Sequence, residues 1–209
     1  MTDISITSPA AGEEPVATAD EAAFYVVSRR KLIILFIATM SFYSFYWFYK
    51  NWEQYRKHGS ASEDARDAIW PIPRAIFSIF FIHSLFRKVK ALGPDQPKVA
   101  AWRDNLGAWW YVIVSITLGI TNRLEKNGIG LPLTSFLGYV CIVLLLLSYV
   151  KAQSMINASC GDPDGKSNNK LTGANWVWIV IFGILYLGAF MHGFNSGAAD
   201  GYASSSSSF

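Results

Sequence analysis

The stretch LPLTSFLGYVCIVLLLLSYV, residues 131–150, decides the fold class, because its twenty residues include no Asp, Glu, Lys or Arg. A helix of this length, at about 1.5 Å per residue, is about as long as the hydrocarbon core of a bilayer is thick. The stretch 175–194 has the same length, and His192 is its only ionisable residue. Two shorter apolar stretches lie at 106–121 and 32–49. The sequence therefore predicts an all-α membrane protein with four transmembrane helices.

The composition of the 209 residues agrees with this prediction. Hydrophobic residues make up 52% of the chain, and charged residues make up 16%, against about 25% in soluble domains. The net charge of +3 does not by itself imply a nucleic-acid partner. The two cysteines, Cys141 and Cys160, lie in a predicted span and in a loop, so they form no disulfide framework. We expect a multi-pass protein whose main partner is the lipid bilayer.

The segment 70–90, WPIPRAIFSIFFIHSLFRKVK, is ambiguous. Its uncharged core, 75–86, is only twelve residues long, which is typical of an in-plane or re-entrant helix. Pro71 and Pro73 favour a helix start at its beginning. If the segment extended to residue 89, it would be long enough to span, and the protein would then have five transmembrane helices.

The positions of the 18 Lys and Arg residues favour the in-plane alternative. With four spans, thirteen basic residues lie on the inner side and five on the outer side. With five spans, eleven lie inside and six outside, and Arg74 lies within the membrane. The five-span alternative has the advantage that the acidic N-terminal tail does not cross the membrane. Both alternatives place 151–174 inside and the C-terminus outside.

The sequence predicts three regions along the chain. Residues 1–24 contain five acidic residues, no Lys or Arg and no apolar periodicity, so we expect a disordered acidic tail. Residues 25–195 form the predicted transmembrane helical domain. Residues 196–209 are rich in serine and are expected to be a flexible tail.

Two sets of residues are candidates for binding roles. The first is a basic and aromatic face that could contact anionic lipid headgroups; it comprises Arg74, His83, Arg87, Lys88 and Lys90. The second consists of small residues that let membrane helices pack closely; it comprises Ser115, Gly119, Gly183, Gly188, Ala189 and Gly193. Neither set is specific, because snorkelling cations and small residues are common in membrane helices.

The sequence favours a non-catalytic role, either as an accessory subunit of a membrane assembly or as a self-associating scaffold. The four expected spans contain no Asp, Glu, Lys or Arg, whereas ion-coupled transporters usually display such residues. No zinc spacing or nucleotide-binding loop occurs, so we expect no metal, no cofactor and no catalytic residue.

Two other functions remain open. An oligomeric channel or uncoupled transporter could be lined by hydroxyl groups, from Ser115, Thr117, Thr134, Ser135 and Ser148. A lipid-acting enzyme could use Asp162 and Asp164, in the loop CGDPDGKSNNK at 160–170, as oxygen ligands for Mg²⁺. An Asx- and Gly-rich turn explains the same two carboxylates without a ligand.

Three motifs resemble those of a group of small bacterial inner-membrane proteins of unknown function. They are FYVVSRRK at 24–31 followed by SFYSFYWFYKNW at 41–52, IWPIPRAIFSIFFIHSLF at 69–86, and CGDPDGKSN at 160–168 followed by ANWVWIV at 174–180. The likeness covers most of residues 24–182. It implies a multi-pass protein of the bacterial inner membrane, and it implies no catalytic residue.

Overall fold

The computed structural model describes residues 21–58, 62 and 67–206, with side chains described as far as Met191. Every regular element among these residues is helical, which confirms the predicted all-α class. The helices are α1 (Arg29–Ala38), α2 (Tyr43–His58), α4 (Pro71–Ile76), α5 (Ser78–Leu92), α6 (Pro97–Ala100), α7 (Asp104–Lys126), α8 (Leu133–Ser159), the short 3₁₀ helix η1 (Lys166–Asn168) and α9 (Gly173–Ser206).

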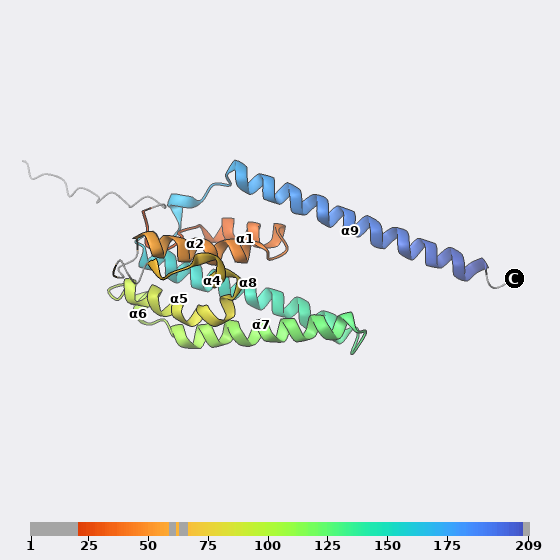
Figure 1. The fold of residues 1–209 in the computed structure, drawn as a ribbon, viewed down its shortest axis with the longest axis horizontal. Helices are drawn as coiled ribbons and strands as arrows, with labels where there is room; N and C mark the ends of the chain where they lie inside the picture. The colour runs from red at the N-terminus through yellow and green to blue at the C-terminus, as the bar shows by residue number, and fades with distance from the viewer. Residues whose placement is uncertain (1–20, 59–61, 63–66, 207–209) are drawn as a thin grey trace, which may run out of the picture.

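The helices α7 and α8 form a long antiparallel hairpin on which the rest of the bundle is built (Figure 1). α7 contains the predicted span 106–121, and α8 contains the predicted span 131–150 from residue 133 onward. The connection 127–132, here called the hairpin tip, turns at Gly128 and Gly130, which adopt φ values of 70° and 73°. The helices α1, α2, α4 and α5 surround only the half of the hairpin that is farther from the tip (Figure 1).

The predicted span 32–49 is wrong as a single helix. The structure divides it into α1 and α2, which are joined by a turn in which Met40 and Ser41 have φ values of 50° and 72°. The hydroxyl of Thr39 stabilises the turn, because it donates to the Leu35 carbonyl at 2.7 Å and accepts from the Tyr43 N–H at 2.9 Å. The result is a helical hairpin in place of one continuous span.

The ambiguous segment 70–90 is also divided. α4 begins at Pro71 and α5 begins at Ser78, with a break at Phe77, whose N–H donates to the Pro73 carbonyl at 2.9 Å. Pro71 fits the first helical position, where its missing N–H costs no hydrogen bond. α4 packs against α2, and α5 packs against the first half of α7.

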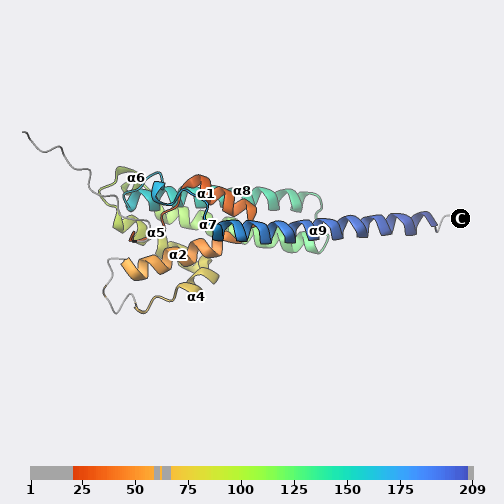
Figure 2. The same cartoon turned by 90° about the horizontal axis from the view of Figure 1, so that it is seen from above.

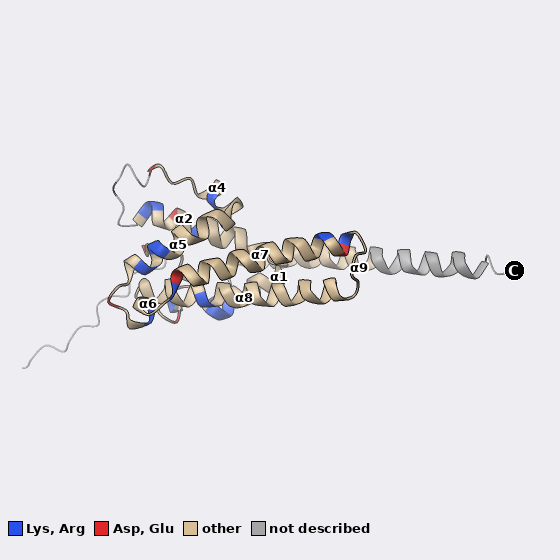
Figure 3. Ribbon diagram, turned by 90° about the horizontal axis from the view of Figure 1, so that it is seen from below, with Lys and Arg blue, Asp and Glu red and all other residues tan. Residues whose placement is uncertain are grey.

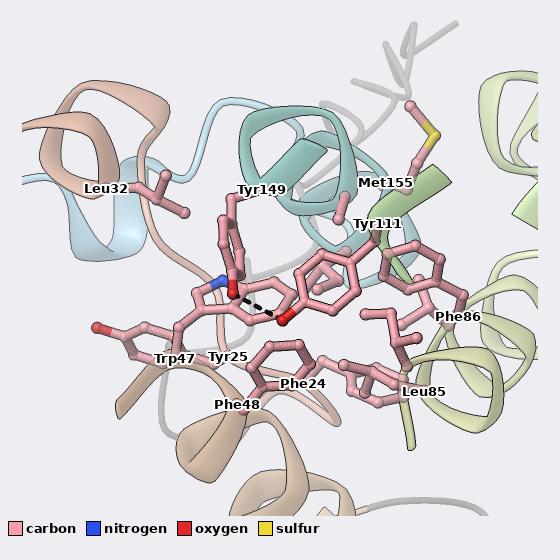
Figure 4. Close-up of a cluster of buried hydrophobic side chains, with 14 of the residues drawn as sticks. Phe24, Tyr25, Leu32, Trp47, Phe48, Leu85, Phe86, Tyr111, Tyr149 and Met155 are labelled. Carbon is pink, nitrogen blue, oxygen red and sulfur yellow. Dashed lines mark hydrogen bonds between the residues drawn. The ribbon is translucent and has the colours of Figure 1, made fainter. Parts of the chain in front are cut away.

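The core lies where α1, α2, α5, α7 and α8 meet, and it includes residues of the segment 22–28 that precedes α1. Phe24 and Val27 in this segment are completely buried, so the predicted disordered tail 1–24 is wrong at its C-terminal end, while residues 1–20 lie outside the described part of the chain. Burial of apolar side chains explains why these last residues are ordered. Figure 4 shows the cluster of buried hydrophobic side chains around them; its labelled members are Phe24, Tyr25, Leu32, Trp47, Phe48, Leu85, Phe86, Tyr111, Tyr149 and Met155.

Helix α9 extends away from the bundle, as the two perpendicular views show (Figures 1 and 2). Its first turns contact α1 and α2, where Phe182 lies 5.2 Å from Phe42 between ring centroids. The helix continues to Ser206, whereas we predicted a flexible tail from 196. Each residue added to an existing helix gains a hydrogen bond without a new nucleation cost, which explains the continuation.

Charged residues are segregated along the long axis of the bundle. Lys and Arg side chains gather at the end formed by α5, α6 and the C-terminus of α8, here called the basic end, and at the tip of α7 (Figure 3). Two helices, Leu133–Ser159 and Gly173–Met191, are long and apolar enough to cross a membrane. α7 is also long, with 23 residues, but it is not one of these two helices. The predicted count of four spans is therefore supported only in part.

Candidate functional site

Arg74, one of the five residues predicted to contact headgroups, is held by aromatic rings. Its guanidinium carbon lies 4.4 Å from the ring centroid of Trp52 and 5.0 Å from that of Phe81. Trp52 is completely buried. Cation–π attraction of this kind is stronger where water is excluded, so Arg74 joins α4 to α2 and α5.

The other four predicted headgroup residues differ in their surroundings. Lys88 stacks on Tyr55 and donates to its hydroxyl at 3.1 Å. Lys90 donates to the Trp102 carbonyl at 2.7 Å and forms a 3.1 Å ion pair with Asp104. His83 packs edge-on against Trp109 at 4.9 Å, and its buried Nε2 has no hydrogen-bond partner among the described residues. Of these four residues, Arg87 alone is exposed, and the other three are half-buried. The predicted set is therefore dispersed over several contacts within the chain.

The small residues that we predicted to pack helices together have little contact with the rest of this chain. A methyl group added at Gly119, Gly183 or Gly188 would meet no atom within 4 Å. Ala189 is exposed, and Ser115 donates to the Tyr111 carbonyl of its own helix at 2.7 Å. Gly193 lies outside the residues whose surroundings are described. The faces of α7 and α9 that carry these small residues are therefore not covered by other parts of the described chain.

The hydroxyl groups predicted to line an oligomeric channel all donate hydrogen bonds within the described chain. Thr117 and Ser148 donate to carbonyls four residues earlier in their own helices, at 2.8 Å in both cases. Ser115 makes the same type of bond. Thr134 donates to the Ile129 carbonyl at 3.2 Å, and Ser135 donates to the Glu125 carboxylate at 2.7 Å near the hairpin tip. Four of the five hydroxyls thus bond within their own helix or the adjoining turn, and that of Ser135 joins α8 to α7.

The acidic loop 160–170 is organised around Asp162. Its carboxylate accepts the N–H groups of Lys166 and Ser167 at 2.9 and 2.8 Å, and the Ser167 hydroxyl at 2.8 Å. Burial alone would raise the pKa of Asp162, but these hydrogen bonds outweigh it and hold the pKa below its usual value. Asp164 is exposed and points to Lys166 at 3.6 Å. No group of three or more potential metal-binding side chains occurs among the described residues.

The most extensive polar contact in the structure was not predicted. Asn157 on α8 is completely buried and binds both backbone groups of Val27, accepting from its N–H at 3.3 Å and donating to its carbonyl at 3.0 Å. One turn earlier, Gln153 donates to the Tyr25 carbonyl at 2.9 Å and accepts from the indole of Trp47. These side chains replace the hydrogen bonds that a neighbouring strand would supply to an extended segment.

Two other asparagines complete this set of contacts, here called the amide clamp, whose residues are Asn51, Gln153, Asn157 and Asn168. Asn51 on α2 accepts from the Tyr25 N–H at 3.3 Å. Asn168 donates to the Val26 carbonyl at 2.9 Å and accepts from the Lys31 ammonium at 2.7 Å. The amide clamp therefore fixes residues 25–28 to α2, α8 and the loop 160–170.

A cavity of about 810 Å³ lies at the basic end, between α7 and α8 and beside α6. Its walls include Trp102, Trp109, Trp110, Leu144 and Leu147, which come from the start of α7 and the middle of α8. Lys98, Arg103 and Lys151 also line it, and no Asp or Glu does. A smaller cavity of about 290 Å³ lies between α9 and the α1–α2 turn.

Comparisons with known proteins supply no assignment for these features: no family model matches the chain, and no similar curated protein or solved structure was found.

Proposed function

We propose that this chain is a non-catalytic integral membrane protein that crosses the bilayer three times, with α7, α8 and α9, and assembles through α9. The helix α9 carries the proposal, because none of its apolar window Gly173–Met191 is buried inside the protein. An apolar helix of this length needs lipid or another helix around it. The role is that of an accessory subunit or self-associating scaffold.

The three-span topology follows from the break in 32–49. When α1 and α2 form a hairpin that enters and leaves on the same side, the N-terminus and the segment 50–103 lie together at the basic end. Sixteen of the 18 Lys and Arg residues then lie on one side, and only Arg123 and Lys126 lie on the other. This distribution follows the positive-inside rule more closely than the four-span or five-span alternatives do.

The apolar surface of the α7–α8 hairpin supports the same placement. Leu133, Phe136 and Tyr139, near the tip, are 61%, 64% and 70% exposed. Large apolar side chains at such exposure are typical of a lipid-facing or partner-facing surface. The segments α4 and α5 reach only part of the way along α7, since Ser78 lies beside Tyr111, with 3.3 Å between the hydroxyls. We therefore propose that they are re-entrant.

Assembly through α9 can be tested by adding bulk to its small residues. In the double variant Gly188→Leu, Ala189→Leu, large side chains replace an open surface, so close packing of another helix is prevented while this chain keeps its own contacts. The matched control is Val177→Phe with Val180→Phe, which adds bulk at exposed positions of α9 that are not small.

The measurement is affinity purification of the full chain in mild detergent, followed by mass determination of the intact assembly. We expect the unaltered chain and the control to be recovered with a second copy or a stoichiometric partner, and the Gly188→Leu, Ala189→Leu variant to be recovered alone. Recovery of the unaltered chain as a lone monomer would contradict assembly through α9.

A further inference from the structure

The 810 Å³ cavity between α7 and α8 has the properties of a site for one amphipathic, anionic molecule. Its volume lies within the range of about 300–1,000 Å³ that is typical of ligand sites. Its lining has a gradient of charge: basic side chains, among apolar ones, line only the end near α6, and the opposite end is lined by Ile113, Leu144 and Leu147. A phosphate and a hydrocarbon chain, joined in one molecule, match this gradient.

The gradient runs in the same direction along both helices, although their chains are antiparallel. On the α7 side, Arg103 lines the cavity immediately before the helix begins, and Trp110 and Ile113 line it farther along one helix face. On α8, it passes from Lys151 through Ser148 to Leu144. Seven residues of helix correspond to about 10 Å, so the charged and apolar ends are separated along the proposed membrane normal.

The three cations of the cavity have no ionic partner in the described structure. Lys98, Arg103 and Lys151 are all exposed, and they make no ion pair or side-chain hydrogen bond among the described residues. Lys50, Lys57, Lys90 and Lys166, in contrast, all have a carboxylate within 4.0 Å. Three cations, one from α6, one from α8 and one from the residue before α7, therefore line the basic end of the cavity without an anion that balances their charge.

Two exposed tryptophans indicate that the basic end of the cavity lies at the depth of the phospholipid headgroups. Trp109 and Trp110 are 53% and 49% exposed, and both line the cavity. Indole rings favour the boundary between headgroups and hydrocarbon. Ile113 and Leu147, farther from the basic end, are 56% and 57% exposed and would contact acyl chains.

We propose that this cavity binds an anionic phospholipid, with an acyl chain between α7 and α8 and the phosphate at Lys98, Arg103 and Lys151. The proposal rests on the membrane placement proposed above and is independent of assembly through α9. The site is separate from the headgroup residues predicted from the sequence, of which Arg74, Lys88 and Lys90 are engaged within the chain.

The test is native mass spectrometry of the full-length protein in mild detergent, titrated with phosphatidylglycerol or with phosphatidylcholine of the same acyl chains. We expect tighter binding of phosphatidylglycerol. The substitutions Lys98→Gln, Arg103→Gln and Lys151→Gln should each weaken it about fivefold, with little effect on phosphatidylcholine. The matched control, Arg29→Gln with Arg30→Gln and Lys170→Gln, removes three exposed charges that do not line the cavity and should leave the preference unchanged.

A second variant tests the apolar part of the site. Ser148→Trp fills the cavity without altering a charge, and it should reduce retention of both lipids. Inorganic phosphate and glycerol phosphate distinguish a lipid from a free phosphate ligand, and neither should displace phosphatidylglycerol at equal concentration. Equal binding of the two lipids, an unchanged preference when Lys98→Gln, Arg103→Gln and Lys151→Gln are combined in one variant, or displacement by phosphate alone would overturn the proposal. The oligomeric mass in the same spectra reports on assembly through α9 separately.

Discussion

Replacement of Asn157 by Leu tests whether the amide clamp holds the extended segment in the core. Leu has nearly the shape of Asn but neither donates nor accepts, so both backbone groups of Val27 lose the side chain that binds them. A buried backbone group without a partner costs about 1–3 kcal/mol, so two such groups cost about 2–6 kcal/mol. Whole domains are stable by only about 5–15 kcal/mol, so we expect segment 22–28 to open locally.

The assay is hydrogen exchange of the full-length protein in mild detergent, followed at the peptide that contains residues 22–28. A loss of about 2 kcal/mol corresponds to exchange that is about thirtyfold faster, and larger losses give faster exchange still. The control is Asn127→Leu at the hairpin tip, where the exposed amide makes one bond to the Arg123 carbonyl. The reasoning would be refuted if segment 22–28 kept the same protection in Asn157→Leu as in the unaltered chain.

Two further predictions concern the loop 160–170, which packs on the same segment. Gly165→Ala should lower the Tm much more than Gly161→Ala does. Both glycines have a positive φ. A methyl group at Gly165, however, would lie 2.6 Å from the Val27 and Ser28 backbone, whereas one at Gly161 would meet nothing within 4 Å. Equal shifts in Tm would disprove this. The pKa of Asp162 in the folded chain lies below its usual 3.8, so the unfolded chain binds more protons at low pH. The stabilisation that the ionised carboxylate provides is present above about pH 5. It should be lost as the pH falls through 3.8 towards the folded pKa. Asp162→Asn should show a smaller loss of stability between pH 5 and 3 than the unaltered chain; an unchanged pH dependence would contradict the role of this carboxylate.

The long apolar stretches were sufficient to place the main helices. Residues 106–121, 131–150 and 175–194 lie within α7, α8 and α9, because long uncharged runs have few stable alternatives to a helix. The break at 39–42 could not be predicted in the same way. It contains no Gly or Pro, and its left-handed residues, Met40 and Ser41, occur in a run that remains apolar and aromatic on both sides.

The binding features were harder to predict than the helices, because they depend on contacts between distant segments. Asn157 lies 130 residues from Val27 in the chain, so neither residue alone indicates the contact. Gln153 and Asn157 are four residues apart and therefore share one helix face. This spacing is the sequence pattern that could have indicated a continuation of α8 past 150 with a polar face turned inward. Lys98, Arg103 and Lys151 counted only towards orientation, and the fold is needed to bring them to one cavity.

The most direct test of the three-span topology is labelling of single cysteines with a membrane-impermeant maleimide in sealed, oriented membranes. Cys141 and Cys160 are first replaced, and single cysteines are introduced as Arg30→Cys in the first turn of α1, Asp95→Cys between α5 and α6, and Asn127→Cys at the hairpin tip; all three positions are exposed. We predict that Arg30→Cys and Asp95→Cys react from the same side and that Asn127→Cys reacts only from the other. If Arg30→Cys and Asp95→Cys reacted from opposite sides, an odd number of crossings would lie between them. The α1–α2 hairpin and the α4–α5 segment could then not both be re-entrant, and the three-span topology would be contradicted.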